Sequence, residues 1–257
     1  MKNINILLTG GSSGIGKAIA KYFSKKNYNV IILDNKKASF KEKNIFFIKC
    51  DLTKIKNFNK IISNVNKKFK SIEVLINCAR SGKRLDIHEE NESNWDKTMS
   101  VNLKSTFFLS QEVAKIMINN KFGRIINISS VAAKFVTTES ASYHASKAGV
   151  VSLTKLFAKK LGKYNINVNT IMPGFILQER YKKKFFSKRN KKFRDAIKNA
   201  IPSNHIGTSN DVAELIEFLI SSNSRYINGE DLFLDGGSNS TSQDSIEMLL
   251  RKFKVIK

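Results

Sequence analysis

Seven short apolar segments recur along the chain, and stretches with hydrophobic residues at helical spacing separate them. Continuous apolar runs are typical of strands buried on both faces, and their alternation with helices predicts an α/β domain with a parallel sheet covered on both sides. Right-handed crossovers then make the sheet doubly wound. The predicted strands are residues 4–9, 30–34, 45–50, 74–78, 124–129, 167–172 and 231–235. The main predicted helices are residues 95–119, 143–163 and 210–221, the last opened by a capping arrangement of Thr208 and Asp211.

The first predicted strand runs directly into the glycine-rich sequence Thr9-Gly10-Gly11-Ser12-Ser13-Gly14-Ile15-Gly16. Four of the thirteen glycines of the chain fall within residues 10–16. Glycines at such a turn allow close approach of the main chain to a pyrophosphate, and the following helix offers unpaired N–H groups to the phosphates. We therefore predict a dinucleotide site here. An ordinary tight strand–helix turn is the alternative, because the glycine spacing differs from the commonest fingerprint.

The second predicted strand ends in Asp34. A carboxylate at this place can hydrogen-bond an adenosine ribose diol and repel a 2′-phosphate, which favours NAD(H) over NADP(H). The residue at position 13 is an uncharged serine, so no cation there would attract the extra phosphate. Lys36 and Lys37 lie just beyond the strand, and they keep NADP(H) as the second cofactor candidate.

Tyr143 and Lys147 lie four residues apart in a predicted helix, downstream of Ser130, and this arrangement predicts acid–base chemistry. An isolated tyrosine titrates near pH ~10. A lysine cation ~5 Å away, at an effective dielectric of ~20, favours the phenolate by roughly 3 kcal/mol, or about two pKa units. That would bring the phenol toward the range of general acid–base catalysis. Tyr22 and Lys26 have the same spacing, and there we expect a helix-surface pair.

Together these motifs resemble the short-chain dehydrogenase/reductase family, from about residue 4 to the sequence Asp235-Gly236-Gly237. The resemblance implies a single Rossmann-type domain over residues 1–237 and hydride transfer between a nicotinamide cofactor and a carbonyl or secondary alcohol. The catalytic residues that it implies are Asn102, Ser130, Tyr143 and Lys147. The cofactor-binding residues that the motifs and the resemblance indicate are Gly10, Ser12, Ser13, Gly14, Ile15, Gly16, Asp34, Asp51, Leu52, Asn77, Ala79, Tyr143, Lys147, Pro173, Gly174 and Ile176.

The resemblance also implies a role for each catalytic residue. In the reducing direction Tyr143 protonates the nascent alkoxide, and Ser130 hydrogen-bonds and orients the carbonyl oxygen. Lys147 lowers the pKa of Tyr143 and binds the nicotinamide ribose. Asn102 holds a water that links Lys147 to solvent.

Three residues depart from the family pattern. Arg80 stands where glycine is usual, so it either crowds the cofactor or places a cation near the substrate. Gln178 occupies the place of a threonine that commonly anchors the nicotinamide carboxamide, and it is longer but retains hydrogen-bonding groups. Cys78 replaces an asparagine, and we expect it to be a small buried residue.

The formal net charge of the chain is +24. Lysine, asparagine and isoleucine are abundant throughout, so coding bias accounts for most of this charge. Cations also concentrate in residues 178–200, which cover the substrate in the family and which we call the lid; a cationic lid suits an anionic substrate or an acidic carrier protein. We expect Phe185, Phe186 and Phe193 to form the apolar face of lid helices. Single-stranded nucleic acid is the disfavoured alternative.

The remaining composition indicates a reduced, metal-free protein outside the membrane. Cys50 and Cys78 have no disulfide or metal-ligand spacing, which predicts free thiols and a cytoplasmic location. His88, His144 and His205 form no cluster at zinc spacing. No apolar stretch reaches the ~18 residues of a membrane helix, and the N-terminus does not resemble a secretory signal.

The residues after the last predicted strand form a separate tail, 238–257. Its polar start is followed by apolar residues at helical spacing, which predicts a short amphipathic helix. This helix is expected to dock on its own subunit or on a neighbour, with membrane association as a minor alternative. The family resemblance implies a homodimer or homotetramer built on the helices at 95–119 and 143–163.

The substrate is the least determined part of the prediction. Residues 201–213 are similar to those of 3-oxoacyl-carrier-protein reductases, so a carrier-bound 3-oxoacyl thioester is the leading candidate. Those reductases usually use NADPH, whereas Asp34 favours NAD(H), so a sugar, polyol or other small-alcohol dehydrogenase is the main alternative. A non-catalytic nicotinamide-binding regulatory protein is the alternative from another class. Arg80 and Gln178, which depart from the family pattern, would then indicate that turnover has been lost.

Overall fold

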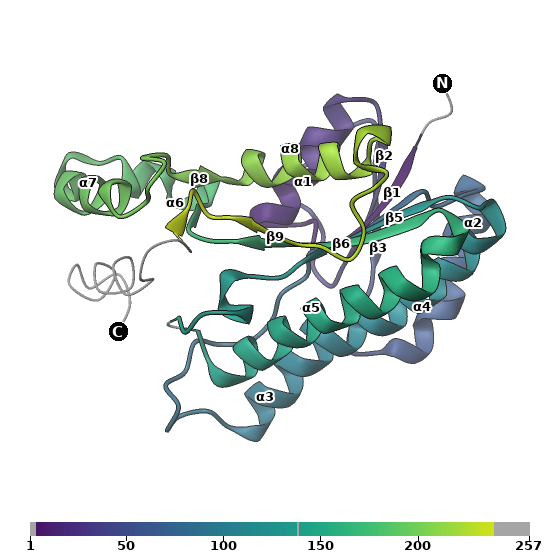
Figure 1. Ribbon diagram of the computed structural model, residues 1–257, viewed down its shortest axis with the longest axis horizontal. Coiled ribbons are helices and arrows are strands. Elements are labelled where there is room, and N and C mark those ends of the chain that lie inside the picture. Colours follow the sequence, from purple (N-terminus) through teal and green to yellow (C-terminus); the bar gives the residue numbers. More distant parts are fainter. Residues whose placement is uncertain (1–3, 138, 239–257) are drawn as a thin grey trace.

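The computed structural model describes residues 4–137 and 139–238 of the chain. Its main sheet has seven parallel strands in the order β3-β2-β1-β4-β5-β6-β9 (Figure 1). This arrangement confirms the predicted doubly wound sheet. The strands are β1 (Asn5–Thr9), β2 (Asn29–Asp34), β3 (Ile45–Lys49), β4 (Val74–Asn77), β5 (Gly123–Ile128), β6 (Ile166–Pro173) and β9 (Asp231–Leu234).

Helices cover both faces of the sheet because successive strand residues point to opposite sides. On one face Leu7 of β1 lies in a core shared with α2 (Phe58–Phe69), α4 (Ser105–Asn120) and α5 (Ala141–Leu161). On the other face Ile6 and Leu8 lie in a core shared with α1 (Gly14–Lys25) and α8 (Ser209–Ile220). Figure 1 shows these two helical layers on either side of the sheet. The capping box of Thr208 and Asp211 opens α8, as predicted.

The helix predicted at 95–119 is three elements rather than one. It consists of α3 (Glu92–Met99), a π-helical turn (Ser100–Lys104) and α4 (Ser105–Asn120). A π turn holds one extra residue per turn and is frequently found at functional sites. It places Asn102 in the buried part of this helical rod. The hydrophobic pattern did not reveal it because the turn preserves the direction of the helix.

The strand order reverses at β1, so the carboxyl ends of β1 and β4 meet at the switch point of the sheet. Thr9 joins these ends: its Oγ1 accepts hydrogen bonds from the backbone N–H groups of Cys78 (3.0 Å) and Ala79 (3.1 Å). The ends of β2, β5 and β6 lie along the same edge of the parallel sheet. The predicted cofactor and catalytic residues are therefore brought to one edge.

The lid is a small unit with its own hydrophobic core. It contains α6 (Glu179–Phe185) and α7 (Lys191–Asn199) and is flanked by the two-stranded pair of β7 (Ile176–Leu177) with β8 (Gly207–Thr208). Phe185 and Phe193 are buried in this core, as predicted, but Phe186 is 58% exposed and lies outside it. In Figure 1 both lid helices project beyond the main sheet.

The predicted tail helix at 238–257 lies outside the described residues, except for Ser238. Across residues 4–137 and 139–238, no helix combines the length and the apolar content that crossing a membrane requires.

Candidate active site

The glycine turn fits tightly against the end of β4 and the start of α1. Gly10 has a left-handed φ of 71°, and a Cβ atom there would lie 2.7 Å from the Cα of Ala79. A Cβ atom on Gly16 would collide with the carbonyl oxygen of Gly10. Both positions therefore require glycine, as the motif predicted.

The start of α1 has the properties of an anion site. Ser13 precedes the helix without a side-chain cap, and the first turn contains no acidic residue. The first N–H groups of a helix have no partner within it, and its N-terminal dipole favours negative charge. Facing this turn, the Oε1 atom of Gln178 is buried without a hydrogen-bond partner among the described residues and would lie 3.3 Å from a Cβ atom on Gly14. These features fit a dinucleotide whose pyrophosphate lies on α1, with the orphaned Gln178 oxygen able to accept a hydrogen bond from the ligand.

Asp34 lies beside the same turn. One of its carboxylate oxygens accepts the backbone N–H of Ser12 at 3.1 Å, and the other accepts that of Lys36 at 3.1 Å. The Ser12 hydroxyl donates to the carbonyl oxygen of Lys36 at 2.6 Å. This network holds a carboxylate at the end of β2, where a ribose diol would reach it.

The other predicted cofactor residues lie in different environments. Asp51 is exposed, and hydrogen bonds from the backbone and side chain of Thr53 hold the pKa of its carboxyl below the usual value. Leu52 is buried, and Pro173, Gly174 and Ile176 lie at the ends of β6 and β7. A Cβ atom on Gly174 would lie 2.6 Å from Cβ of Asp235, so this turn also requires glycine.

Asn77 supports the sheet instead of pointing along its edge. Its Nδ2 atom donates to Asn127 Oδ1 at 2.8 Å and to Ser110 Oγ at 3.1 Å, and all three side chains are buried. Asn127 in turn donates to Thr154 Oγ1 at 2.8 Å. The amide N–H groups of Asn77 are thus engaged within the protein, so its side chain positions β4 and β5 relative to the helices.

The catalytic candidates converge at the end of β5. Tyr143 is 8% exposed and Lys147 is 3% exposed, and the Lys147 Nζ lies 5.6 Å from the centroid of the Tyr143 ring. Nζ donates to the carbonyl oxygen of Ile128 at 2.7 Å. Ser130 follows β5, and its hydroxyl forms a hydrogen bond that lowers the pKa of Tyr143. The predicted serine, tyrosine and lysine therefore form one cluster.

The electrostatics of Tyr143 differ from the sequence-based expectation. Burial raises the pKa of its hydroxyl above the usual value, and this effect outweighs the positive charge of Arg80, which lowers it. Lys147 was expected to supply that lowering, but the charge that lowers the pKa of Tyr143 most is that of Arg80. Burial also lowers the pKa of Lys147 to about 8. The sequence argument omitted desolvation, which penalises both charged forms.

Asn102 links the loop after β4 to α5. Its Oδ1 accepts the backbone N–H of Ser81 at 2.8 Å, and its Nδ2 donates to Ser146 Oγ at 3.1 Å. Its carbonyl oxygen accepts the hydroxyl of Thr106 at 2.8 Å. The side chain is therefore fixed next to the helix that carries the tyrosine and lysine.

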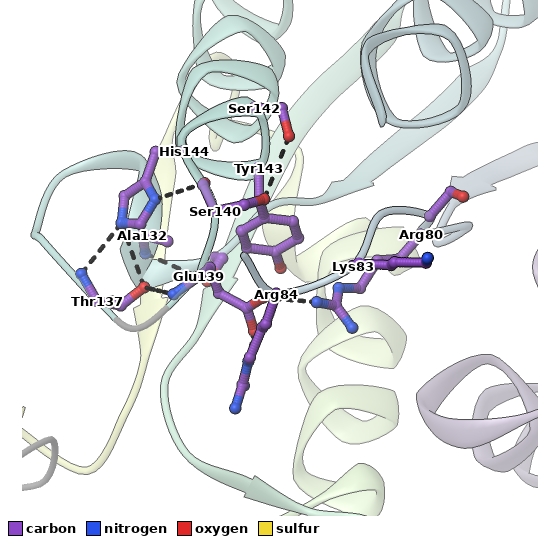
Figure 2. Close-up of polar contacts among 12 residues, drawn as sticks. Arg80, Lys83, Arg84, Ala132, Thr137, Glu139, Ser140, Ser142, Tyr143 and His144 are labelled. Atoms are coloured by element: carbon purple, nitrogen blue, oxygen red, sulfur yellow. Dashed lines mark hydrogen bonds and ion pairs between the residues drawn. The ribbon is translucent and has the colours of Figure 1, made fainter. Parts of the chain in front are cut away.

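Two carboxylates that the sequence did not single out complete the site. Glu90 accepts the backbone N–H (3.1 Å) and the hydroxyl (2.8 Å) of Ser142 in the first turn of α5, next to Tyr143. Glu139 forms ion pairs of 2.7 Å with both Arg80 and Arg84 (Figure 2). These contacts join residues more than fifty positions apart, and no local spacing signals them.

Replacing Lys147 with methionine is expected to change how stability depends on pH. Between pH about 8 and 10.5 the folded wild-type chain has released a proton that the unfolded chain still holds. The free energy of unfolding of the wild type should therefore rise with pH relative to the variant, by up to about 3 kcal/mol across this window. Urea unfolding at several pH values measures the difference. Parallel curves for the two proteins would contradict the lowered pKa.

Comparison with known proteins gives consistent matches. A family model described as enoyl-(acyl carrier protein) reductase matches residues 10–239. The chain is 35% identical to the NAD-dependent glycerol dehydrogenase of Listeria innocua, over 90% of the chain and 92% of that protein. It is 36% identical to the 3-oxoacyl-[acyl-carrier-protein] reductase FabG of Rickettsia prowazekii, over 90% of the chain and 95% of that protein. Among solved structures, ElxO with NADP bound shares 32% identity and a TM-score of 0.83, covering 94% of this chain and 100% of ElxO.

Proposed function

The chain belongs to the short-chain dehydrogenase/reductase family of NAD(P)-dependent oxidoreductases, and from this we propose that Tyr143 is the general acid/base for interconversion of a carbonyl and a secondary alcohol. The observation that carries the proposal is the cluster of buried Tyr143 and Lys147 beside Ser130, on the sheet edge that also bears the uncapped start of α1. A bound nicotinamide dinucleotide supplies or accepts the hydride. The protein binds it, orients the carbonyl and manages the proton.

The raised pKa of Tyr143 favours its role as proton donor. At neutral pH the hydroxyl is protonated, so it can donate a proton to the carbonyl oxygen that becomes an alkoxide. Ser130 hydrogen-bonds the same oxygen and orients it. Lys147, with a pKa of about 8, is mostly protonated at pH 7. It binds the nicotinamide ribose and exchanges protons with the surroundings of Tyr143. Asn102 positions the helix that carries both residues.

We propose NAD(H) as the preferred cofactor and NADP(H) as the alternative. Asp34 supports this preference because its carboxylate lies beside the glycine turn. The glycerol dehydrogenase relative is NAD-dependent and 4-hydroxyisoleucine dehydrogenase was solved with NADH, whereas ElxO was solved with NADP. The relatives therefore support a nicotinamide cofactor of either kind, and Asp34 favours NAD(H).

Two substrate classes follow from the relatives. The FabG relative supports a 3-oxoacyl thioester on a carrier protein, and the glycerol dehydrogenase supports a small alcohol. The sequence of residues 201–213 favours the first and Asp34 favours the second. The two unpaired cysteines support a reducing, cytoplasmic environment, and the family supports a homodimer or homotetramer.

Steady-state assays with both reduced cofactors test the proposal. The panel contains 3-oxobutyryl thioester, dihydroxyacetone and small oxo acids, each with NADH and with NADPH. We expect turnover of at least one carbonyl and a kcat/KM at least about tenfold higher with NADH. Cofactor binding without turnover of any carbonyl would favour a regulatory protein.

Replacing Asp34 with alanine tests the proposed cofactor preference. Removing the carboxylate should reduce the ratio of NADH to NADPH efficiency about tenfold, because both the ribose hydrogen bonds and the repulsion of a 2′-phosphate are lost. Glu42→Ala, which removes an exposed carboxylate before β3 that has no predicted cofactor role, should leave that ratio unchanged. An unaltered ratio in Asp34→Ala would contradict the assignment.

A further inference from the structure

The proposed mechanism gives no substrate-binding role to two arginines that share the Glu139 carboxylate, Arg80 and Arg84, which we call the arginine pair. The guanidinium carbon of Arg80 lies 4.8 Å from the centroid of the Tyr143 ring. Glu139 joins the two arginines, with Oε2 at 2.7 Å from Arg80 Nη2 and Oε1 at 2.7 Å from Arg84 Nη2. Figure 2 shows the carboxylate and the Arg80 guanidinium next to the tyrosine ring.

The two guanidinium groups share one carboxylate, that of Glu139. The positive charge of Arg80 acts on the reacting hydroxyl, because it lowers the pKa of Tyr143. The Glu139 side chain is 12% exposed, whereas those of Arg80 and Arg84 are 44% and 48% exposed. The cations are therefore on the outer side of the cluster, where a ligand approaching Tyr143 would meet them.

Arg80 has hydrogen-bonding capacity beyond its described partners. A guanidinium group has five N–H donors in a planar fork that matches carboxylate and phosphate oxygens. Within the described ranges, Arg80 donates to Glu139 and hydrogen-bonds Tyr143. Because Glu139 fixes the guanidinium before any ligand arrives, little side-chain entropy remains to be lost when an anion binds.

We infer that Arg80, held in place by Glu139, binds an anionic group of the substrate, a carboxylate or a phosphate, while the reacting carbonyl lies at Tyr143 and Ser130. The inference rests on the proposed function and narrows its substrate. The carbonyl substrate is then a small oxo acid or a phosphorylated ketone, with the charge a few bonds from the reacting carbon. A 3-oxoacyl thioester is uncharged next to its reacting carbonyl, so it is the poorer substrate.

Pairs of carbonyl compounds that differ in charge test the inference. Acetoacetate with methyl acetoacetate tests the carboxylate, and dihydroxyacetone phosphate with dihydroxyacetone tests the phosphate. The wild type should have at least about tenfold higher kcat/KM for the charged member of one pair, the discrimination expected from hydrogen bonds to a charged group. The pair that shows this preference identifies the anion. Equal kcat/KM values within both pairs would overturn the inference.

Arg80→Met should remove this preference, mainly through a higher KM for the charged member. Arg80→Lys should restore part of it, because it keeps the charge but not the planar fork. Lys83→Met is the matched control: it removes an exposed cation from the same loop and should leave the ratio within each pair unchanged. A ratio that is the same in Arg80→Met and in the wild type would overturn the inference.

Direct binding separates this inference from the proposed reaction. Calorimetric titration of the Tyr143→Phe variant, saturated with NADH, measures the affinity for the charged and uncharged members without turnover. We expect the charged member of one pair to bind at least about tenfold more tightly, and Arg80→Met added to this variant should abolish the difference. If binding depends on Arg80 but the wild type reduces no carbonyl, the anion site stands and the proposed reaction is wrong. If the wild type reduces a carbonyl but binding does not depend on Arg80, the proposed reaction stands and the anion site is wrong.

Discussion

Replacing Tyr143 with phenylalanine is expected to lower kcat by about a hundredfold to ten-thousandfold, the range that a positioned general acid contributes. The variant loses only the hydroxyl, and the ring still fills a position that is 8% exposed. The free energy of unfolding and the affinity for NADH should therefore stay close to those of the wild type. Steady-state kinetics, thermal unfolding and fluorescence titration with NADH measure these three quantities.

Tyr22→Phe is the matched control, because Tyr22 in α1 also precedes a lysine by four residues, here the C-cap Lys26. Its hydroxyl donates to Glu217 at 2.6 Å, on the helical layer formed by α1 and α8, and Lys26 pairs with the same carboxylate. We expect kcat to be unchanged in Tyr22→Phe. If Tyr143→Phe lost NADH binding and turnover to the same extent, the tyrosine would be a structural residue and the proposed mechanism would be wrong.

The pH dependence of the two reaction directions should also follow the state of this hydroxyl. A phenol with a raised pKa stays protonated at neutral pH, so it can donate a proton during carbonyl reduction. Alcohol oxidation needs the phenolate, whose population grows as pH rises. The charge of Arg80 lowers the pKa of Tyr143, whereas burial raises it. The arginine that is proposed to bind the substrate therefore also affects how easily Tyr143 ionises.

The sheet could be predicted from sequence because each of its strands is a local apolar run that is buried on both faces. The strands from β1 to β9 in the main sheet agree with the predicted segments within one residue at each end. The lid could be predicted only in part. Phe185 and Phe193 share a core and Phe186 does not, and this distinction depends on the relative rotation of two short helices.

Some of the site residues could also be predicted from local sequence, whereas the roles of others depend on distant partners. Gly10 and Gly16 were predictable because backbone conformation and close packing leave glycine as the only residue that fits. The structural role of Asn77 was not, because its partners Ser110 and Asn127 come from other elements. The pKa shift of Tyr143 was predicted in the wrong direction, because burial and the position of Arg80 depend on the folded chain.

The glycine turn should be sensitive to the addition of a single methyl group. Gly16→Ala adds a single methyl group that would collide with the carbonyl oxygen of Gly10, a backbone atom that cannot move away without opening the turn. We expect α1 to shift from the turn and the affinity for NADH to fall by about tenfold to a hundredfold, the equivalent of an overpacking cost of about 1–3 kcal/mol. Fluorescence titration with NADH measures the loss.

Gly162→Ala is the control for the general effect of adding a methyl group to a glycine. The new Cβ atom would lie 3.2 Å from Nδ2 of Asn228, the end of a side chain that can adjust. Its NADH affinity should match the wild type, and thermal unfolding should show both variants folded. If Gly16→Ala bound NADH normally, the pyrophosphate could not depend on the close contact between α1 and the turn, and the proposed cofactor position would have to be abandoned.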